Sequence, residues 1–440
     1  MMKLIIICKF SFMKNNVVLR DLLIVASLFF ISVFAQAADG KLTNLNYTLS
    51  NYMPYESPRV ECAKPPKGYK PFYISHYGRH GSRFHYSSYD YEKMYRLFQK
   101  ADSAKALTAQ GMLVSDRFKK MYFEYYDRAG DLTPMGAVQH KSIAHNMMEN
   151  YPELFEKGSV VDAKSSTSTR CIMSMDAFCQ QIKEENPHVE IRNESSKRLM
   201  YYLASPKHAS RDIERRQRDS TWKAAFGDLH KKYVHPARLV KQLFRDSAYV
   251  AKNIDTIAFM RDFYTLKCSL ASFPTDVNFD DVWLPEELIG NWIVQNAWWY
   301  GSYGPCPMTK NESRFFETDL LKKIIEEADA AIQKGDVQVN LRFGHDTALM
   351  PLTALMGLSG CDAKVTNLDT LRYVWNDYKI IPMAGNVQIV FYRSKKKDDV
   401  LVRVMLNERD VTLPIESEVA PYYEWGKMKK YFNDVLAEQK

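Results

Sequence analysis

The chain has 440 residues, of which 46% are hydrophobic and 25% are charged, with a formal net charge of +8. This length and composition suit one large domain or two with a sizeable core, and the absence of heptads and repeats excludes a coiled-coil or repeat protein. The mild positive charge is spread along the chain without a recognition motif, so nucleic-acid binding is not indicated, whereas an anionic substrate would be attracted.

The N-terminus has the pattern of a secretory signal peptide over residues 1–37. Two basic residues lead into an apolar run at 22–34, and Ala35-Gln36-Ala37 offers a small-x-small cleavage site. The run is shorter than the roughly 20 residues that span a bilayer, which favours cleavage near Ala37 over a retained anchor. Met13 is an alternative start. We therefore expect a periplasmic or secreted protein without stable membrane association.

Cleavage would remove four basic residues and one acid, which lowers the formal charge from +8 to +5. Six of the seven cysteines would remain. An exported protein permits disulfides among them, although the sequence does not choose between the possible pairings. No CxxC pair is present, so neither a zinc centre nor a thioredoxin-like centre is predicted, and no metal or other cofactor is expected.

The first predicted unit is a strand at 71–76 followed by a glycine-containing loop with the segment Arg79-His80-Gly81-Ser82-Arg83. A helix is predicted over 87–127. A second helix is predicted to begin at Thr133 and Pro134 and to run to about residue 150. Threonine suits the N-cap and proline suits the first helical position.

A second strand is predicted at 159–164, and it leads to Arg170 and a helix over 171–185. Residues 186–330 contain amphipathic and aromatic helical segments with little β-type alternation. They predict an α-helical cap inserted between two parts of an α/β core, residues 38–185 and 331–440.

The last part of the chain predicts a third strand–loop–helix unit and a terminal hairpin. A strand at 337–343 alternates as expected. It ends at Gly344-His345-Asp346, with helix predicted over 347–356. Strands at 387–392 and 400–406 form the predicted hairpin.

Three predicted strand ends thus carry Arg79, His80 and Arg83, then Arg170, then His345 and Asp346. Loops at the carboxyl ends of strands line one crevice of an α/β sheet, so these side chains would converge. Arginine guanidiniums match phosphate oxygens, and a desolvated cluster of them predicts a bound phosphoryl group.

In such a site His80 would attack phosphorus, because a neutral imidazole nitrogen is a nucleophile that gives a hydrolysable adduct. The arginines and His345 would hold the equatorial oxygens. Asp346 would protonate the leaving oxygen and then activate water. Taken singly, each of these residues has an ordinary structural role: His345 suits a structural histidine, Asp346 suits a helix N-cap and Arg170 suits a surface arginine. The occurrence of all three motifs in one chain favours the catalytic interpretation.

In these motifs the chain resembles the histidine acid phosphatases, a branch of the histidine phosphatase superfamily that includes phytases, glucose-1-phosphatases and multiple inositol polyphosphate phosphatases. The resemblance rests on five segments: Arg79-His80-Gly81-Ser82-Arg83, Leu132-Thr133-Pro134-Met135-Gly136, Thr169 to Phe178, Gly344-His345-Asp346-Thr347 and Val402 to Asn407. It implies a Rossmann-like mixed sheet flanked by helices, as in phosphoglycerate mutase, with an inserted helical cap. It also implies an exported phosphomonoesterase, with an inositol phosphate such as phytate as the expected substrate.

Several positions depart from the family pattern. Phe84-His85 follows Arg83 where the family usually has x-Pro, and we expect His85 to be a loop residue. Cys171 and Ala348 replace a usual threonine and asparagine, which puts phytase-like contacts in doubt. Inositol polyphosphate phosphatases usually carry His-Ala-Glu at the last motif, whereas His345-Asp346 is the arrangement of acid phosphatases and bacterial phytases.

Four alternatives remain at this stage. The first is a broad-specificity or sugar-phosphate acid phosphatase. The second is a phosphate-ligand binding protein without catalysis, against which His80 and Asp346 argue. A mutase is disfavoured by export, and a metal-dependent His-Asp phosphohydrolase would need further ligands, none of which stands out in the sequence.

Overall fold

A mixed β-sheet with strand order β3-β2-β4-β1-β5-β6-β7 forms the centre of the fold, and β8 pairs with β6. The strands are β1 (Tyr69–Arg79), β2 (Val160–Ser165), β3 (Glu190–Ser195), β4 (Val339–Gly344), β5 (Asn386–Ser394), β6 (Val400–Leu406), β7 (Arg409–Asp410) and β8 (Tyr422–Glu424). Strands β1 to β4 pair in parallel, and β5 pairs antiparallel to β1 and begins the C-terminal antiparallel part. The predicted mixed α/β sheet is therefore confirmed.

This computed structural model describes residues 44–58, 63–204, 220–310, 312–396 and 399–439. Residues 45–440 form one compact unit. The predicted signal peptide at 1–37 lies outside the described residues, so it stays a prediction.

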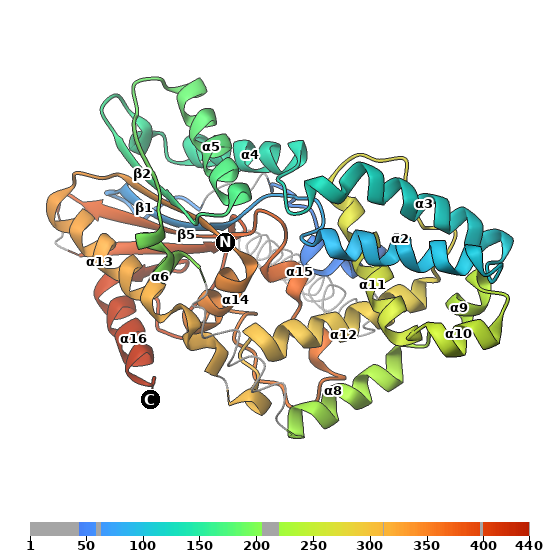
Figure 1. The fold of residues 1–440 in the computed structure, drawn as a ribbon. Helices are drawn as coiled ribbons and strands as arrows, with labels where there is room; N and C mark the ends of the chain where they lie inside the picture. The colour runs from blue at the N-terminus through green and yellow to red at the C-terminus, as the bar shows by residue number, and fades with distance from the viewer. Residues whose placement is uncertain (1–43, 59–62, 205–219, 311, 397–398, 440) are drawn as a thin grey trace, which may run out of the picture. The chain divides into compact units, whose positions relative to one another are not determined.

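Helices cover both faces of the sheet (Figure 1). One face carries α4 (Pro134–Asn150) and α5 (Thr169–Glu185), which pack against each other. Across the sheet, α13 (Thr318–Lys334) contacts β1 and α16 (Trp425–Ala437) contacts β6, with α14 (Asp346–Leu355) beside them.

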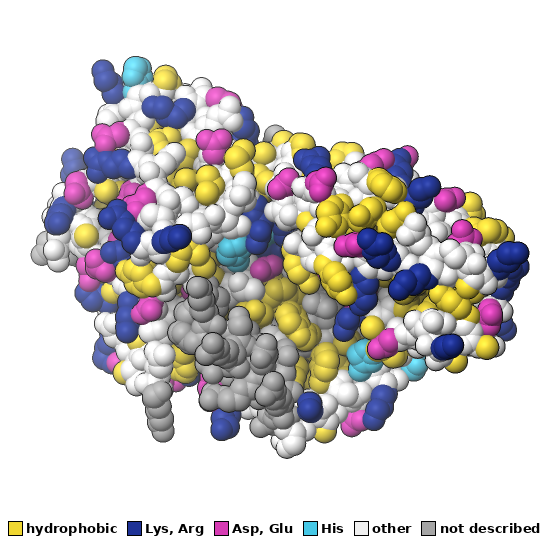
Figure 2. Space-filling model, viewed as in Figure 1, with side chains coloured by type: hydrophobic (Ala, Val, Ile, Leu, Met, Phe, Trp, Pro, Cys, Tyr) yellow, Lys and Arg dark blue, Asp and Glu magenta, His cyan; other side chains and the backbone are white. Residues whose placement is uncertain are grey.

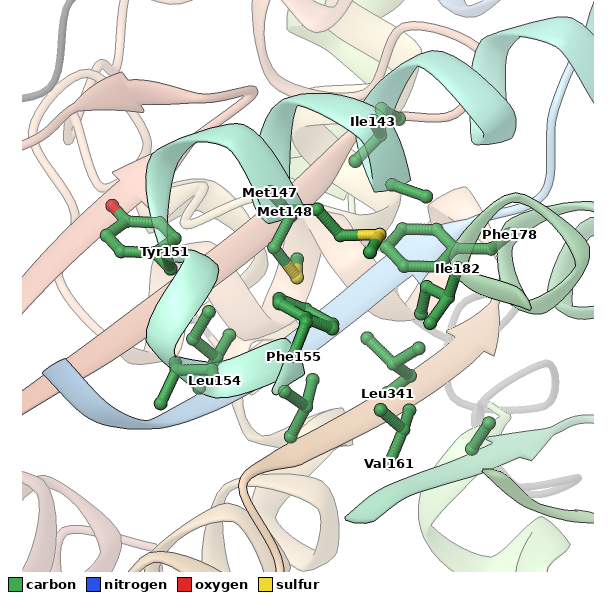
Figure 3. Close-up of a cluster of buried hydrophobic side chains, with 14 of the residues drawn as sticks. Ile143, Met147, Met148, Tyr151, Leu154, Phe155, Val161, Phe178, Ile182 and Leu341 are labelled. Carbon is green, nitrogen blue, oxygen red and sulfur yellow. The ribbon is translucent and has the colours of Figure 1, made fainter. Parts of the chain in front are cut away.

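The core beneath α4 and α5 is apolar and closely packed (Figure 3). Met147 and Met148 of α4 and Phe178 and Ile182 of α5 belong to one buried cluster with Leu341 on β4. Fully burying a side chain of this size stabilises the fold by about 1.5–3 kcal/mol. This packing fixes the position of the parallel strands whose ends carry the predicted site.

The other helices form a lobe to the right of the sheet in Figure 1. They are α2 (Ser88–Ser103), α3 (Ala109–Tyr125), α8 (Ser220–Tyr233), α9 (Ala237–Leu243), α10 (Ser247–Asn253), α11 (Thr256–Ser269) and α12 (Pro285–Tyr303). Two short helices, α6 (Met200–Leu203) and α15 (Asp377–Ile380), lie elsewhere in the chain. Of these two, α6 contacts α13 and β4, whereas α15 contacts α12.

Helices α2 and α3, predicted as part of the core segment, pack against α9 and α11 of the predicted cap segment. The ring of Phe98 on α2 lies 5.3 Å from Phe118, 5.7 Å from Phe244 and 6.0 Å from Phe259, measured between centroids. The lobe core thus draws on both segments. The division into core and cap at 186–330 remains a prediction, and α13 runs across its C-terminal limit.

Some local predictions hold and others need correction. Thr133 caps α4 as predicted, because its side chain accepts a hydrogen bond from the Gly136 amide. The single helix predicted over 87–127 is two helices, separated before Thr108, which caps α3 through the Gly111 amide. The segment 190–195, predicted as helical cap, is the edge strand β3; none of its side chains is buried, so it shows no apolar alternation.

Five cysteines fall in the described part of the chain, and all five are buried free thiols: Cys171, Cys179, Cys268, Cys306 and Cys361. The disulfides expected of an exported protein are therefore not formed among these residues. Cys62 lies outside the described residues. Within the same ranges, no helix is both long and apolar enough to cross a membrane.

Candidate active site

The three predicted strand ends lie side by side at one edge of the sheet. Strand β4 is between β2 and β1, and Arg79 at the end of β1 is in register with Gly344 at the end of β4. The His80 amide donates to the Gly344 carbonyl at 2.9 Å, and the Ser166 amide donates to the Phe343 carbonyl at 2.9 Å. Because the strands are parallel, their carboxyl ends deliver the motif residues to one place.

Glycines permit close approach around this edge. A Cβ at Gly81 would lie 2.4 Å from the Gly136 carbonyl oxygen, so the loop after β1 packs directly on the first turn of α4. A Cβ at Gly344 would lie 2.0 Å from the Tyr77 hydroxyl. Any side chain at these positions would push the loop and strand ends apart.

His80 is buried and its ring orientation is set by its own loop. Its Nδ1 lies 2.9 Å from the Gly81 carbonyl oxygen. A carbonyl only accepts, so Nδ1 carries the proton and Nε2 keeps its lone pair. Burial, and then the charges of the nearby arginines, hold the pKa of His80 well below its usual range. The residue is therefore a neutral imidazole with an available Nε2.

Three arginines surround His80, of which Arg79 and Arg83 are buried and Arg170 is half-buried. Each has a buried Nε with no hydrogen-bond partner among the described residues. Burial lowers the pKa of Arg79 to about 10 and also lowers that of Arg170, yet both remain cationic near neutral pH. Buried guanidinium donors without partners are costly, and an oxyanion would satisfy them.

His345 lies beside His80, with the two ring centroids 5.7 Å apart. Its Nε2 is 3.2 Å from the Ser166 hydroxyl, and its Nδ1 is 3.4 Å from Nη2 of Arg170. Burial, followed by the Arg170 charge, lowers the pKa of His345 to about 4. His345 also occupies the N-cap position of α14, so Asp346, which taken singly suits an N-cap, is the first residue of the helix instead.

Asp346, the first residue of α14, faces the arginine cluster. Its Oδ2 lies 2.8 Å from Nη2 of Arg79 and accepts a hydrogen bond from the Asn51 side chain at 3.0 Å. Burial disfavours the carboxylate, but the charges of Arg79 and Arg83 outweigh it and hold the pKa of Asp346 at about 2. Without a phosphoryl group the carboxyl is thus ionised.

Asn51 is a site residue that sequence reasoning missed. Its side chain reaches Asp346, and its carbonyl accepts a hydrogen bond from Nη1 of Arg79 at 2.6 Å. It belongs to the short helix η1 (Leu45–Tyr52), which contacts α11, α12 and α15. No motif marks this segment, because its position depends on contacts with residues far away in the sequence.

His85 differs from the expectation of an ordinary loop residue. Its side chain is buried, with Nδ1 at 2.9 Å from the Tyr52 hydroxyl and Nε2 at 2.7 Å from Oδ2 of Asp90. It thus belongs to a buried hydrogen-bonded chain next to Arg83.

The surface is hollowed between the sheet core and the helical lobe, and basic, acidic and histidine side chains are visible together there (Figure 2). Within the described ranges, no cluster of three or more His, Cys, Asp or Glu side chains has the arrangement of a metal site. The cluster of one neutral histidine, three arginines and one carboxyl has the side chains that a site for phosphoryl transfer requires.

Comparison with known proteins identifies the family. Residues 78–407 match the model of the histidine phosphatase superfamily (branch 2), and the chain belongs to this family, as its motifs predicted. It is 21% identical over 395 residues to multiple inositol polyphosphate phosphatase 1 of Gallus gallus, covering 86% of this chain and 85% of that protein. The match to the Homo sapiens protein of the same name is 26% identical over 148 residues, and covers 32% of this chain but only 30% of the human protein.

A solved structure shows the same fold. The multiple inositol polyphosphate phosphatase of Bifidobacterium longum, in complex with inositol hexasulfate, superposes with a TM-score of 0.73 at 19% identity, covering 90% of this chain and 98% of that chain. Both the predicted family and the predicted fold are thereby confirmed, and the chain is a member of the histidine acid phosphatases.

Proposed function

We propose that this protein is an exported phosphomonoesterase that hydrolyses inositol phosphates such as phytate through a phosphohistidine on His80. The observation that carries the proposal is the environment of His80: its Nδ1 is held by the Gly81 carbonyl, which leaves Nε2 free among three arginines whose Nε atoms are buried. A neutral nucleophile beside fixed positive charge is what attack on an anionic phosphoryl group requires.

In the first step, Nε2 of His80 forms a bond to phosphorus while the bond from phosphorus to the ester oxygen breaks. Arg79, Arg83, Arg170 and His345 would hold the equatorial oxygens. The leaving alkoxide takes the proton of Asp346, which becomes a carboxylate. In the second step that carboxylate removes a proton from water, the water oxygen bonds to phosphorus, and the nitrogen–phosphorus bond breaks to release phosphate and His80.

Asp346 must be protonated to act as the acid, although Arg79 keeps it ionised in the empty pocket. A phosphate ester supplies the change. Its negative charges engage the arginine cluster and lie near the carboxyl, and both effects raise the pKa of Asp346. Binding of the substrate would therefore itself favour the protonated form of Asp346 that acts as the acid.

The substrate class rests on the relatives. Two of them are named multiple inositol polyphosphate phosphatases, and the similar solved structure holds inositol hexasulfate. The His345-Asp346 pair differs from the His-Ala-Glu expected of those enzymes, so a sugar phosphate or a broad range of esters is the alternative. Export is supported by the sequence pattern of residues 1–37.

A turnover screen tests the proposal. Phytate, glucose-1-phosphate, nucleotides and p-nitrophenyl phosphate would be compared at several pH values between about 4 and 8, the range that a titrating carboxyl and histidines control. A kcat/KM for phytate above those of the other natural esters supports the inositol phosphate assignment. An equal or higher kcat/KM for glucose-1-phosphate would contradict the inositol phosphate assignment and favour a sugar phosphate. No turnover of any ester would contradict the proposed phosphatase function.

A further inference from the structure

Arg83 is held differently from Arg79, the arginine that pairs with the acid of the pocket. Among the salt bridges of the described residues Arg79 pairs with Asp346, whereas Arg83 has no carboxylate partner there. Its guanidinium carbon instead lies 5.2 Å from the ring centroid of Tyr52 and 5.7 Å from that of Tyr86, and Nη1 donates to the Phe84 carbonyl at 3.0 Å. Cations are attracted to aromatic faces at such distances.

The Tyr52 ring is itself fixed by a buried chain of hydrogen bonds. The Tyr52 hydroxyl lies 2.9 Å from Nδ1 of His85, and Nε2 of His85 lies 2.7 Å from Oδ2 of Asp90. Tyr52 is 4% exposed and His85 is 1% exposed, so neither side chain is free to turn toward water. His85 stands at the position where the family motif usually has proline.

The direction of these hydrogen bonds follows from the last acceptor. Burial opposes ionisation of Asp90, but the interactions with His85, together with those of Ser87 and Lys93, outweigh it and lower the pKa of Asp90. A carboxylate only accepts, so His85 donates from Nε2 and its Nδ1 is left as an acceptor. The Tyr52 hydroxyl must then donate to Nδ1. Burial raises the pKa of Tyr52 to about 12, which is consistent with a phenol that keeps its proton.

We propose that Asp90, His85 and Tyr52 form a positioning chain that holds Arg83 toward the phosphoryl group. Asp90 sets the tautomer of His85, His85 orients the Tyr52 hydroxyl, and the ring of Tyr52 supports the guanidinium. Arg83 then keeps its donors for the substrate instead of for a protein carboxylate. The inference rests on the proposed function only in that phosphate binds this pocket.

A purely structural role for His85 is the competing explanation, and its backbone contacts allow the two to be separated. The His85 amide donates to the Tyr91 hydroxyl at 3.1 Å, and its carbonyl accepts from the Gly130 amide at 2.8 Å. Both contacts survive substitution of the side chain. The imidazole is therefore the part that the positioning role requires.

The experiment measures the dissociation constant of inorganic phosphate by calorimetry, together with kcat and KM. Tyr52→Phe keeps the ring but removes the donor to His85, and should weaken phosphate binding about 5-fold, the size of one buried hydrogen bond. His85→Asn retains an acceptor near Nδ1 and should lose less than His85→Leu, which has none. Tyr89→Phe, at a tyrosine that is 65% exposed, is the control and should change nothing.

The decisive comparison repeats Tyr52→Phe in an Arg83→Ala background. If Tyr52 acts through Arg83, the substitution has no further effect on phosphate affinity once the guanidinium is gone. An unchanged 5-fold loss in that background would overturn the proposal, as would wild-type affinity in Tyr52→Phe alone. Equal losses in His85→Asn and His85→Leu, with matching falls in Tm, would also overturn it.

Because the readout is equilibrium binding, failure of the positioning chain is distinguishable from failure of the phosphatase function. An enzyme that binds phosphate but turns over no ester still reports on Arg83 and Tyr52. Loss of turnover in the wild-type protein would therefore remove the proposed function and leave this comparison intact.

Discussion

The two sides of the pocket handle positive charge in opposite ways. On the acid side, Arg79 forms an ion pair with Asp346 and donates hydrogen bonds to the carbonyls of Asn51 and Ile381. On the phosphate side, Arg83 rests on aromatic rings and on no carboxylate among the described residues. The charge of Arg79 is thus paired with a carboxylate before substrate arrives, whereas the charge of Arg83 has no carboxylate partner among the described residues. The contrast suggests that binding and acid catalysis can be perturbed separately.

The largest expected effect comes from removing the nucleophile between the two sides. His80→Ala should lower kcat by about 10³-fold or more, because the nitrogen that forms the bond to phosphorus is removed. Inorganic phosphate should still bind, since the arginines remain. Steady-state kinetics and calorimetry measure both. Substantial residual turnover would contradict the role of His80.

A smaller and selective effect is expected on the acid side. Asp346→Asn cannot donate a proton to the leaving oxygen, so kcat/KM for phytate or a sugar phosphate, which reports the step in which the leaving group departs, should fall about 10²-fold or more. p-Nitrophenyl phosphate has a stable leaving group and should lose much less. The ratio of the two losses is the measurement, and an equal loss on both esters would exclude Asp346 as the acid.

Much of this architecture could be predicted because short stretches of the sequence determine it. Strand ends followed by Arg79-His80, Arg170 and His345-Asp346 indicate both the sheet and the edge where the pocket lies, and β1, β4 and β2 are indeed neighbours. Capping by Thr133 is likewise a short-range signal. The prediction succeeded wherever periodicity and turn chemistry agreed within one segment.

The failures have a common physical cause, which is dependence on distant contacts. Asn51 and Tyr52 reach the pocket only because η1 packs against α11, α12 and α15. Strand β3 was missed because an exposed edge strand needs no apolar alternation. His85 was underestimated because its partners, Tyr52 and Asp90, are visible only once the chain is folded.

The balance on the acid side can be shifted without removing the acid. Asn51→Ala deletes a hydrogen bond that favours the ionised carboxyl, so the pKa of Asp346 should rise from its lowered value. Asn51→Asp should raise it further, because a second carboxylate disfavours the charged form. A general acid works below its pKa, so the alkaline limb of the profile for a sugar phosphate should move upward by about one pH unit or less. An unmoved profile in both variants would mean that Asn51 does not tune Asp346.

The smallest expected effect on kcat comes from substituting a histidine that lies on neither side of the pocket. His140 on α4 is fully buried, and burial lowers its pKa to about 3, against a smaller opposing contribution from the backbone at Arg79. At this group the folded state binds fewer protons than the unfolded state. The contribution of His140 to the unfolding free energy is therefore fully present above about pH 6.5 and is lost as the pH falls toward 3. Acidification from pH 7 to pH 4 should cost about 3 kcal/mol from this group.

His140→Met should therefore flatten the dependence of the unfolding free energy on pH while leaving kcat near its wild-type value. Denaturant titrations at several pH values provide the measurement. His188→Met, at an exposed position, is the matched control and should leave the slope unchanged. A wild-type slope in the His140 variant would show that the acid sensitivity has another source.

The central claim is that the phosphoryl group passes through His80, and trapping the intermediate tests it most directly. The enzyme would be mixed with substrate, quenched within milliseconds under alkaline denaturing conditions that preserve phosphohistidine, and digested for mass spectrometry. The account predicts a phosphoryl group on His80, with more of it accumulating in Asp346→Asn on p-nitrophenyl phosphate, because water activation is slowed. Phosphate on another residue, or turnover with no phosphorylated enzyme in either protein, would contradict it.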